Sequence, residues 1–328
     1  MRYLGSKTLL LDEIAKLVEG YGKQGVFCDP FGGIGTVGSS MKARGYQIVT
    51  GDILNFAHCF QVALIENCTM PEFLRVKQEF GIEDVEGYLT TQTSEMGWLI
   101  DEYALKRKYF TLENAIHIQG CIDCINDWNN RKLLQEGEYE VLIASLIESF
   151  DKVANTAGTY YAYLKDFYRK ANNEFKYSLI NPTAGINGCK AYLLDANELV
   201  KKQKCDVLYL DPPYNERNYS RYYHLPETIS LGIEPKPKGK SGVYIYQEIE
   251  SAYNRKMKAT EAFEDLIKAT DAKCIIFHYT DNGIIQCDDA RDILRGKGRI
   301  DEFYFDCKGY NTALGEKKSQ HHIFRVMC

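Results

Sequence analysis

The stretch Gly25 to Gly38, GVFCDPFGGIGTVG, joins a short apolar strand, a glycine-rich turn and the start of a helix. Glycines in such a turn allow a sharp change of direction and let the backbone approach a ligand closely. Further strand candidates follow at 46–53, 190–196, 205–214 and 272–283, and a closing hairpin is expected near the end of the chain. Helical stretches such as 6–21 and 56–65 separate the early strands. This alternation predicts an α/β fold with an open, mostly parallel sheet covered by helices on both faces.

About 120 residues of mainly helical pattern separate the second and third strand candidates, whereas a parallel crossover needs only about a dozen residues. The excess predicts an inserted, mainly helical domain over 69–177. The sheet domain then consists of 1–68 and 178–328.

Composition limits the class of protein. The net charge of -5 argues against a general cationic coat for nucleic acid, although a local basic patch is still compatible with it. No apolar run approaches 18 residues, so no membrane-spanning helix and no membrane partner are expected. The N-terminus lacks the apolar segment of a signal peptide, and the 11 cysteines lack the spacing of a disulfide framework. A cytoplasmic location is therefore expected.

Acidic residues stand at the ends of three successive strand candidates: Asp29, Asp52 and Asp195. Asp29 directly before the glycine turn would repel a pyrophosphate and attract an ammonium group. Asp52 is placed to accept hydrogen bonds from ribose hydroxyls, and Asp195 from an exocyclic amine. These carboxylates favour a nucleoside with an amino-acid tail, and S-adenosylmethionine fits that description. The alternative is a glycine turn that serves only packing, with the acids as solvated strand ends.

The apolar run Val207 to Leu210 ends at Asp211-Pro212-Pro213-Tyr214. The two prolines cannot donate to a ladder and they fix the backbone. The Asp211 carboxylate and the Pro212 carbonyl can then point at one place, where two acceptors suit an exocyclic amine with two hydrogens. Tyr214 offers an aromatic face for stacking. The pattern favours methyl transfer to a nucleobase amine by direct displacement, on a base flipped out of its duplex.

These motifs resemble those of the Dam-like, alpha-group adenine DNA methyltransferases of the FokI type. DPPY is similar to the family's catalytic motif, DPFGGIG to its cofactor loop and RYLGSK, residues 2–7, to its N-terminal motif. The resemblance implies the Rossmann-like fold of S-adenosylmethionine-dependent methyltransferases and a target-recognition role for the insert. It implies a catalytic motif of Asp211, Pro212, Pro213 and Tyr214. It also implies a cofactor site made of Tyr3, Lys7, Asp29, Pro30, Phe31, Gly33, Gly35, Asp52, Ile53, Asp195, Ala196 and Asp211.

The sequence departs from the Dam-like pattern in one respect, because the long insert precedes Asp195 here and follows the corresponding acid in those relatives. Double-stranded DNA is the expected substrate and a cognate restriction endonuclease a possible partner. The residues expected to contact DNA are Arg217, Asn218, Tyr219, Arg221, His224, Lys236, Lys238 and Lys308. The alternatives are methylation of a cytosine amine or of RNA, or a non-catalytic binding protein on the same fold.

Three weaker patterns have less specific interpretations. Cys121 and Cys124 form a lone CxxC motif near His117, but a zinc site needs a fourth ligand, so buried helical thiols are favoured and no metal is expected. His278 is interpreted as a core histidine. The aromatic cluster in residues 160–168 is expected in the core of the insert, with a base-stacking surface as the alternative.

Overall fold

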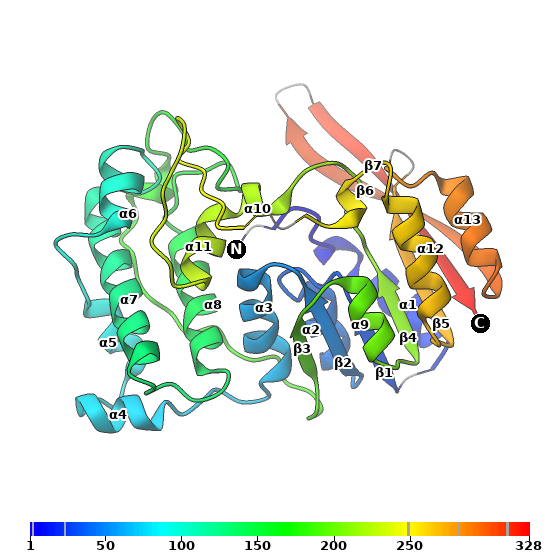
Figure 1. The fold of residues 1–328 in the computed structure, drawn as a ribbon, viewed down its shortest axis with the longest axis horizontal. Helices are drawn as coiled ribbons and strands as arrows, with labels where there is room; N and C mark the ends of the chain where they lie inside the picture. Colours follow the sequence, from blue (N-terminus) through cyan, green and yellow to red (C-terminus); the bar gives the residue numbers. More distant parts are fainter. Residues whose placement is uncertain (2, 23, 248–249, 281–282, 313–314) are drawn as a thin grey trace. The chain divides into compact units, whose positions relative to one another are not determined.

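The computed structural model describes residues 1, 3–22, 24–247, 250–280, 283–312 and 315–328, without the side chains of 306–319. The chain divides into two compact units (Figure 1). The sheet unit comprises Lys7–Ile53, Thr183–Asn218 and Glu250–Cys328, and the helical unit comprises Met1–Ser6, Leu54–Pro182 and Tyr219–Ile249. The helical unit thus contains the predicted insert 69–177, together with segments that we had assigned to the sheet domain: 1–6, 54–68, 178–182 and 219–249.

The sheet unit is built on seven strands in the order β3-β2-β1-β4-β5-β7-β6. Strands β3, β2, β1, β4 and β5 run parallel, and β7 pairs antiparallel with both β5 and β6. The predicted α/β class with a mostly parallel sheet is confirmed. The strands are β1 (Val26–Asp29), β2 (Gln47–Asp52), β3 (Lys190–Leu193), β4 (Val207–Leu210), β5 (Cys274–Tyr279), β6 (Arg299–Thr312) and β7 (Gly315–Met327).

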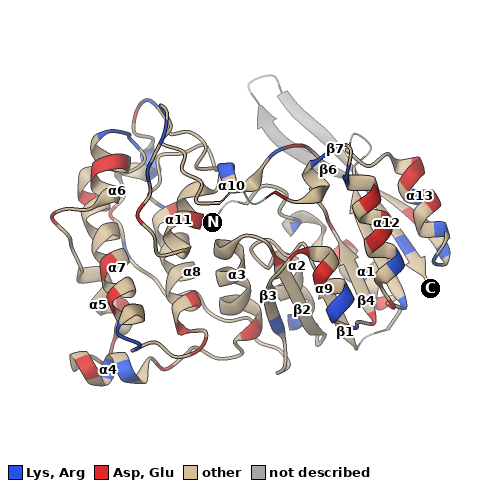
Figure 2. Ribbon diagram, in the orientation of Figure 1, with Lys and Arg blue, Asp and Glu red and all other residues tan. Residues whose placement is uncertain are grey.

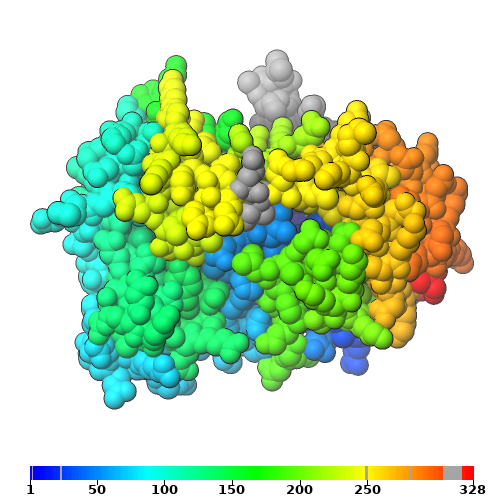
Figure 3. Space-filling view, in the orientation of Figure 1, coloured from blue at the N-terminus to red at the C-terminus, as the bar shows by residue number. Residues whose placement is uncertain are grey.

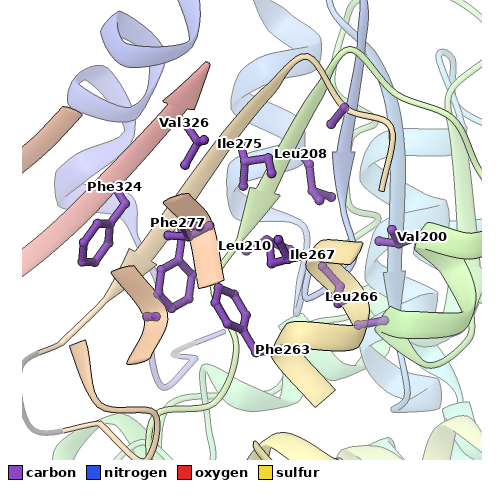
Figure 4. Packing of buried hydrophobic residues seen from close by; sticks show 14 of the residues in the cluster. Val200, Leu208, Leu210, Phe263, Leu266, Ile267, Ile275, Phe277, Phe324 and Val326 are labelled. Atoms are coloured by element: carbon purple, nitrogen blue, oxygen red, sulfur yellow. The ribbon is translucent and has the colours of Figure 1, made fainter. Parts of the chain in front are cut away.

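Helices cover both faces of this sheet, with α1 and α2 behind it in Figure 1 and α9, α12 and α13 in front. The front layer buries one continuous apolar cluster, in which Phe263 and Leu266 of α12 pack over Leu208 and Phe277 (Figure 4). Alternation along a strand puts Leu208 and Leu210 on this face and Tyr209 on the other. The helices of the unit are the 3-10 turn η1 (Thr8–Leu10), α1 (Leu11–Glu19), α2 (Thr36–Ala43), α9 (Ala196–Lys202), η5 (Ala252–Asn254), α12 (Ala259–Ala269) and α13 (Cys287–Arg295).

The helical unit packs around α7 (Leu112–Asn130) and α8 (Glu138–Asp151). Thr111 caps α7 by accepting a hydrogen bond from the Asn114 N–H, and Trp128 is fully buried. The other elements are α3 (Asn55–Gln61), the π-helical turns η2 (Val62–Glu66) and η3 (Asp101–Leu105), α4 (Leu74–Phe80), α5 (Val85–Thr91), α6 (Trp98–Ile100), the 3-10 turn η4 (Arg169–Asn172), α10 (Tyr219–Tyr222) and α11 (His224–Ser230). Within the described part of the chain, no helix has the length and apolar character needed to cross a bilayer.

Candidate active site

The strand order reverses between β1 and β4, because the chain builds β1, β2 and β3 toward one edge and β4 and β5 toward the other. Open parallel sheets bind ligands beyond the carboxyl ends of their strands at such a switch point. Asp29 ends β1, Asp52 ends β2 and Asp211 directly follows β4. The fold therefore gathers the predicted acids at the edge where a ligand is expected.

The glycine turn connects β1 to α2 in the conformation that its sequence requires. Gly33 and Gly35 have φ values of 50° and 79°, which side chains with a Cβ rarely adopt. The turn is held against β2, since the Gly32 N–H donates to the Gly51 carbonyl at 2.9 Å. The Gly33 N–H donates to Asp52 Oδ2 at 3.0 Å. This contact places the Asp52 carboxylate beside the turn.

Asp29 is the most unusual group at this edge. Its side chain is only 2% exposed, and its Oδ1 atom has no hydrogen-bond partner among the described residues. Burial raises the pKa of Asp29 to about 8, with repulsion from Asp211 adding to the effect. The other side of the carboxyl accepts a hydrogen bond from the Phe31 backbone. A buried acceptor atom without a partner is costly, so Oδ1 favours a cationic donor of a ligand, such as an ammonium group.

Asp211 is paired with a lysine from the N-terminal segment. Lys7 Nζ lies 2.5 Å from Asp211 Oδ2 and 6.0 Å from the centre of the Tyr214 ring. Lys7 is 5% exposed and Asp211 is 16% exposed. Burial raises the pKa of Asp211, and the Lys7 ammonium opposes that rise. Lys7 was predicted as a cofactor residue, and the structure gives it a contact with the predicted catalytic motif that the sequence did not indicate.

The segment after Asp211 is anchored by a residue that the sequence did not single out. Asn254 in η5 donates through Nδ2 to the carbonyls of Asn215 at 2.9 Å and Arg217 at 3.0 Å. The Ile284 N–H donates to the Tyr214 carbonyl at 3.2 Å. No motif marks Asn254, because its role depends on a long-range contact of the kind that a single sequence does not display.

The remaining predicted cofactor residues of the sheet unit lie in the same part of the fold. Asp195 caps α9 by accepting the Asn197 N–H at 2.9 Å, and the Leu194 N–H donates to the Asp52 carbonyl at 3.0 Å. Phe31 packs edge-on against Tyr253 with 4.8 Å between ring centres. Pro30 and Ala196 are buried, and Ile53 is partly buried directly after β2.

Tyr3, also predicted for the cofactor site, belongs to the helical unit. It stacks on Tyr223 at 5.1 Å between ring centres and also contacts Phe56 and Tyr219. Its backbone neighbour is held as well, since the Leu4 N–H donates to the Tyr223 hydroxyl at 2.7 Å. The observed surroundings of Tyr3 are thus an aromatic cluster of its own unit.

Comparison with known proteins decides the family. Residues 3–294 match the family described as D12 class N6 adenine-specific DNA methyltransferase. The chain belongs to this family. It is 36% identical to the type II methyltransferase M.FokI of Planomicrobium okeanokoites over 98% of the chain and 50% of M.FokI. It is 35% identical to the modification methylase StsI of Streptococcus sanguinis over 90% of the chain and 46% of StsI.

A third relative is similar to the chain over nearly its whole length. The type II methyltransferase M.NlaIII of Neisseria lactamica is 32% identical over 92% of the chain and 90% of M.NlaIII. By contrast, the chain spans about half the length of M.FokI and StsI. The resemblance inferred from the motifs is confirmed at the level of the D12 family.

The residues predicted to contact DNA have different surroundings. Arg217 is exposed in the sheet unit, where Asn218 is partly buried. In the helical unit, Arg221 of α10 is exposed, as are Lys236 and Lys238 of a nearby stretch of chain. Figure 2 shows basic residues on α10 and on loops around α6. Tyr219 is partly buried beside Tyr3, and the Lys308 side chain lies outside the described residues.

His224 does not fit the prediction of a DNA contact. It is 1% exposed, and its Nε2 atom lies 2.8 Å from the Tyr160 carbonyl. Burial lowers the pKa of His224 to about 4, so the ring is neutral near pH 7. The prediction was wrong because proximity to DPPY in sequence does not show that every residue of α11 is buried.

The weaker sequence patterns have ordinary structural surroundings. Cys121 of α7 is buried and its thiol donates to the Leu89 carbonyl at 3.1 Å. His278 is buried between Tyr209 and His321, as expected for a core histidine. The aromatic cluster is divided, since Tyr160 is fully buried whereas others, among them Tyr161 and Tyr168, are exposed.

Proposed function

We propose that the chain transfers a methyl group from S-adenosylmethionine to the exocyclic amine of an adenine flipped out of duplex DNA. The observation that carries this proposal is the Lys7–Asp211 pair in the DPPY motif, together with the buried Asp29 carboxyl at the switch point of the sheet, whose Oδ1 atom has no hydrogen-bond partner among the described residues. Family membership supports the choice of adenine and of DNA.

The DPPY motif is proposed to hold the target amine. An ionised Asp211 and the Pro212 carbonyl would each accept one hydrogen of the amine, which leaves the nitrogen lone pair free to attack. Burial favours the protonated form of Asp211, and a protonated carboxyl loses acceptor capacity. The adjacent Lys7 ammonium favours the ionised form. Lys7 is therefore proposed to maintain the acceptor that the reaction requires.

Tyr214 and the anchor behind it would position the base. The Tyr214 ring is partly exposed, and it is proposed to stack on the base. Asn254 fixes the two carbonyls that follow the motif. Orientation of this kind supplies much of the acceleration when two reactants must meet in line.

The cofactor is proposed to lie beyond the carboxyl ends of β1 and β2, where the residues fit its charges. The Asp29 Oδ1 atom would accept from the ammonium group, and Asp52 would accept from the ribose. Asp195 is proposed for the adenine amine, although one of its oxygens already caps α9. When bound, S-adenosylmethionine supplies a methyl group on a sulfonium centre. The residues of the chain bind and orient the reactants.

A modification role beside a cognate restriction endonuclease is also proposed. The named relatives M.FokI, StsI and M.NlaIII are type II methyltransferases or modification methylases. The chain itself contributes no residues that we assign to DNA cleavage. Protection of host DNA from an endonuclease with the same recognition site is the expected consequence.

The test is transfer of label from S-adenosylmethionine to unmethylated plasmid, followed by sequencing that reports the modified base and its surrounding motif. N6-methyladenine within one short motif is expected. Asp211→Ala should abolish transfer while leaving cofactor affinity within a few-fold. Asp288→Asn is the matched control, because that acid lies on α13 and is 90% exposed. Absence of label on DNA with a folded, cofactor-binding protein would refute the proposal, and label on cytosine would redirect it to that base.

A further inference from the structure

One loop of the helical unit is held by more side-chain hydrogen bonds than its sequence predicts. The stretch PKPKGKSG, residues 235–242, has the composition of a solvated loop. In the structure, the segment 238–245 makes a narrow turn, in which the Lys238 N–H donates to the Val243 carbonyl at 3.2 Å. This part of the chain contributes to the surface of the unit in Figure 3, where it is yellow.

Three side chains near α6 hold this turn by its carbonyls. The buried Tyr103 hydroxyl donates to Gly242 at 2.7 Å, and the buried Tyr109 hydroxyl donates to Ser241 at 2.8 Å. Arg107 donates to Gly239 at 3.1 Å and to Lys240 at 3.2 Å. Buried donors of this kind fix a loop in one conformation, which is a requirement for a precise binding site.

Gly242 shows how closely the turn is fitted to its support. Its φ is 68°, and a Cβ at this position would lie 2.6 Å from Arg107 Nε. Arg107 is itself fixed by an ion pair with Glu102 Oε2 at 2.6 Å. The turn and its support therefore form one packed arrangement.

The fixed turn encloses a cavity together with α10. The cavity has a volume of about 470 Å³ and is lined by Arg221, Lys238, Gly239, Val243, Tyr244 and Ile245. Among the lining residues that the structure describes, Arg221 and Lys238 are cationic and none is acidic. Arg221 and Lys238 are 17 positions apart in sequence, so their meeting in one cavity is a consequence of the fold. A smaller cavity beside it shares Tyr244 and Ile245 and includes Glu227.

The Glu227 carboxylate does not neutralise the cationic cavity, because it is used elsewhere. It accepts hydrogen bonds from the N–H groups of Asn55 and Phe56 at the start of α3, each at 3.0 Å. Its side chain is 7% exposed. The charged residues among the described lining of the larger cavity are therefore Arg221 and Lys238.

We propose that this cavity binds a phosphodiester group of the DNA substrate, an inference that rests on the proposed function and adds a contact point to it. The planar guanidinium of Arg221 suits paired hydrogen bonds to phosphate oxygens, and Lys238 adds a point charge. A phosphate contact positions DNA without reading its sequence. The proposed site would therefore position the DNA backbone on the protein in the same way for any target sequence.

The test measures the salt dependence of binding between a labelled DNA duplex and the full chain, saturated with S-adenosylhomocysteine. A plot of log affinity against log salt has a negative slope, and each lost phosphate contact reduces the magnitude of that slope by about 0.9. Arg221→Gln and Lys238→Gln should each do so, and the weakening between about 50 and 200 mM salt should shrink by about 3.5-fold per variant. The change should be the same for duplexes of unrelated sequence.

Lys240→Gln is the matched control, because it removes the same charge from the same turn outside the lining of the cavity. Its slope should equal that of the unchanged chain. An unaltered slope for Arg221→Gln and Lys238→Gln in a chain that still methylates DNA would overturn only this inference. An equal loss for Lys240→Gln, or a loss confined to one sequence, would overturn it as well. A chain that neither binds nor methylates duplex DNA would refute the proposed function and this inference with it.

Discussion

Asp29→Asn offers the sharpest test of the cofactor site, because the expected effect on stability is opposite to the effect on function. The folded state holds the pKa of Asp29 at about 8, against an ordinary value of 3.8. The unfolded chain therefore releases this proton at lower pH than the folded chain does. Stability is fully present below the ordinary pKa and falls as pH rises toward the folded value.

The size of this effect follows from the difference between the two pKa values. At about 1.36 kcal/mol per unit, the ligand-free protein loses up to about 4 kcal/mol of stability between pH 4 and pH 7 through this group. Asparagine does not titrate, so the variant should not undergo this loss. The difference in unfolding free energy between the variant and the unchanged chain should grow with pH over that range.

The assay is urea unfolding of both ligand-free proteins at several pH values, since the titration of all other groups cancels in the comparison. In parallel, equilibrium dialysis should show a large loss of S-adenosylmethionine affinity in the variant. Affinity of the unchanged chain should rise from pH 6 to pH 8, because a bound ammonium group favours the ionised carboxylate. A stability difference that does not change with pH, or an unchanged affinity, would refute the reasoning.

Further predictions concern other residues of the two units. Lys7→Met should move the acidic limb of the kcat/KM profile to higher pH, because the Lys7 ammonium lowers the pKa of Asp211; an unmoved limb would contradict the role of Lys7. Asn254→Ala removes two hydrogen bonds and should cost about 1–2 kcal/mol of stability, with a fall in kcat larger than the change in cofactor affinity. His224→Asn should lower stability at pH 7 by about 1–3 kcal/mol, measured by urea unfolding, and should leave the salt slope of DNA binding unchanged; a changed slope would restore its predicted DNA contact.

The sequence predicted the sheet well because its signals are local. Each strand of the parallel sheet is a short apolar run, and the glycines before α2 adopt the φ values that the turn demands. The acids at strand ends were predictable for the same reason, since a parallel sheet brings the carboxyl ends of its strands to one edge. The pKa values of these acids could not be predicted from the sequence, because the raised pKa of Asp29 depends on its burial and on the nearby Asp211.

Contacts between distant segments were the part that the sequence did not reveal. Lys7 reaches Asp211 across more than 200 positions, and Asn254 anchors a segment some 40 positions before it. The role of 219–249 in the helical unit was also not anticipated, because the sequence of α11 does not show that the whole helix is buried or which unit it packs in. His224 was misassigned for this reason.

The strand order explains how a long insert can precede β3 without disturbing the candidate site. The insert lies between β2 and β3, and β3 is an edge strand that pairs only with β2 among the described strands. A long insert before an edge strand does not change the pairing of β1 with β4. The proposed site residues Asp29 and Asp211 depend on those two strands. The insert directly affects only the predicted cofactor role of Asp195, which follows β3.

Several of the points where the chain passes from one unit to the other lie close in sequence to residues of the candidate site. The chain passes between its units at five points, of which two are at Thr183 and Glu250 and three are at Lys7, after Ile53 and after Asn218. All three positions adjoin the candidate site in sequence, since Lys7 pairs with Asp211, Ile53 follows Asp52, and Asn218 lies four positions after Tyr214. Short covalent segments thus connect the helical unit to the proposed catalytic residues. Lengthening the segment after Tyr214 with glycine and serine should therefore reduce kcat while leaving cofactor affinity intact, and an unaffected kcat would show that this linkage contributes nothing to positioning.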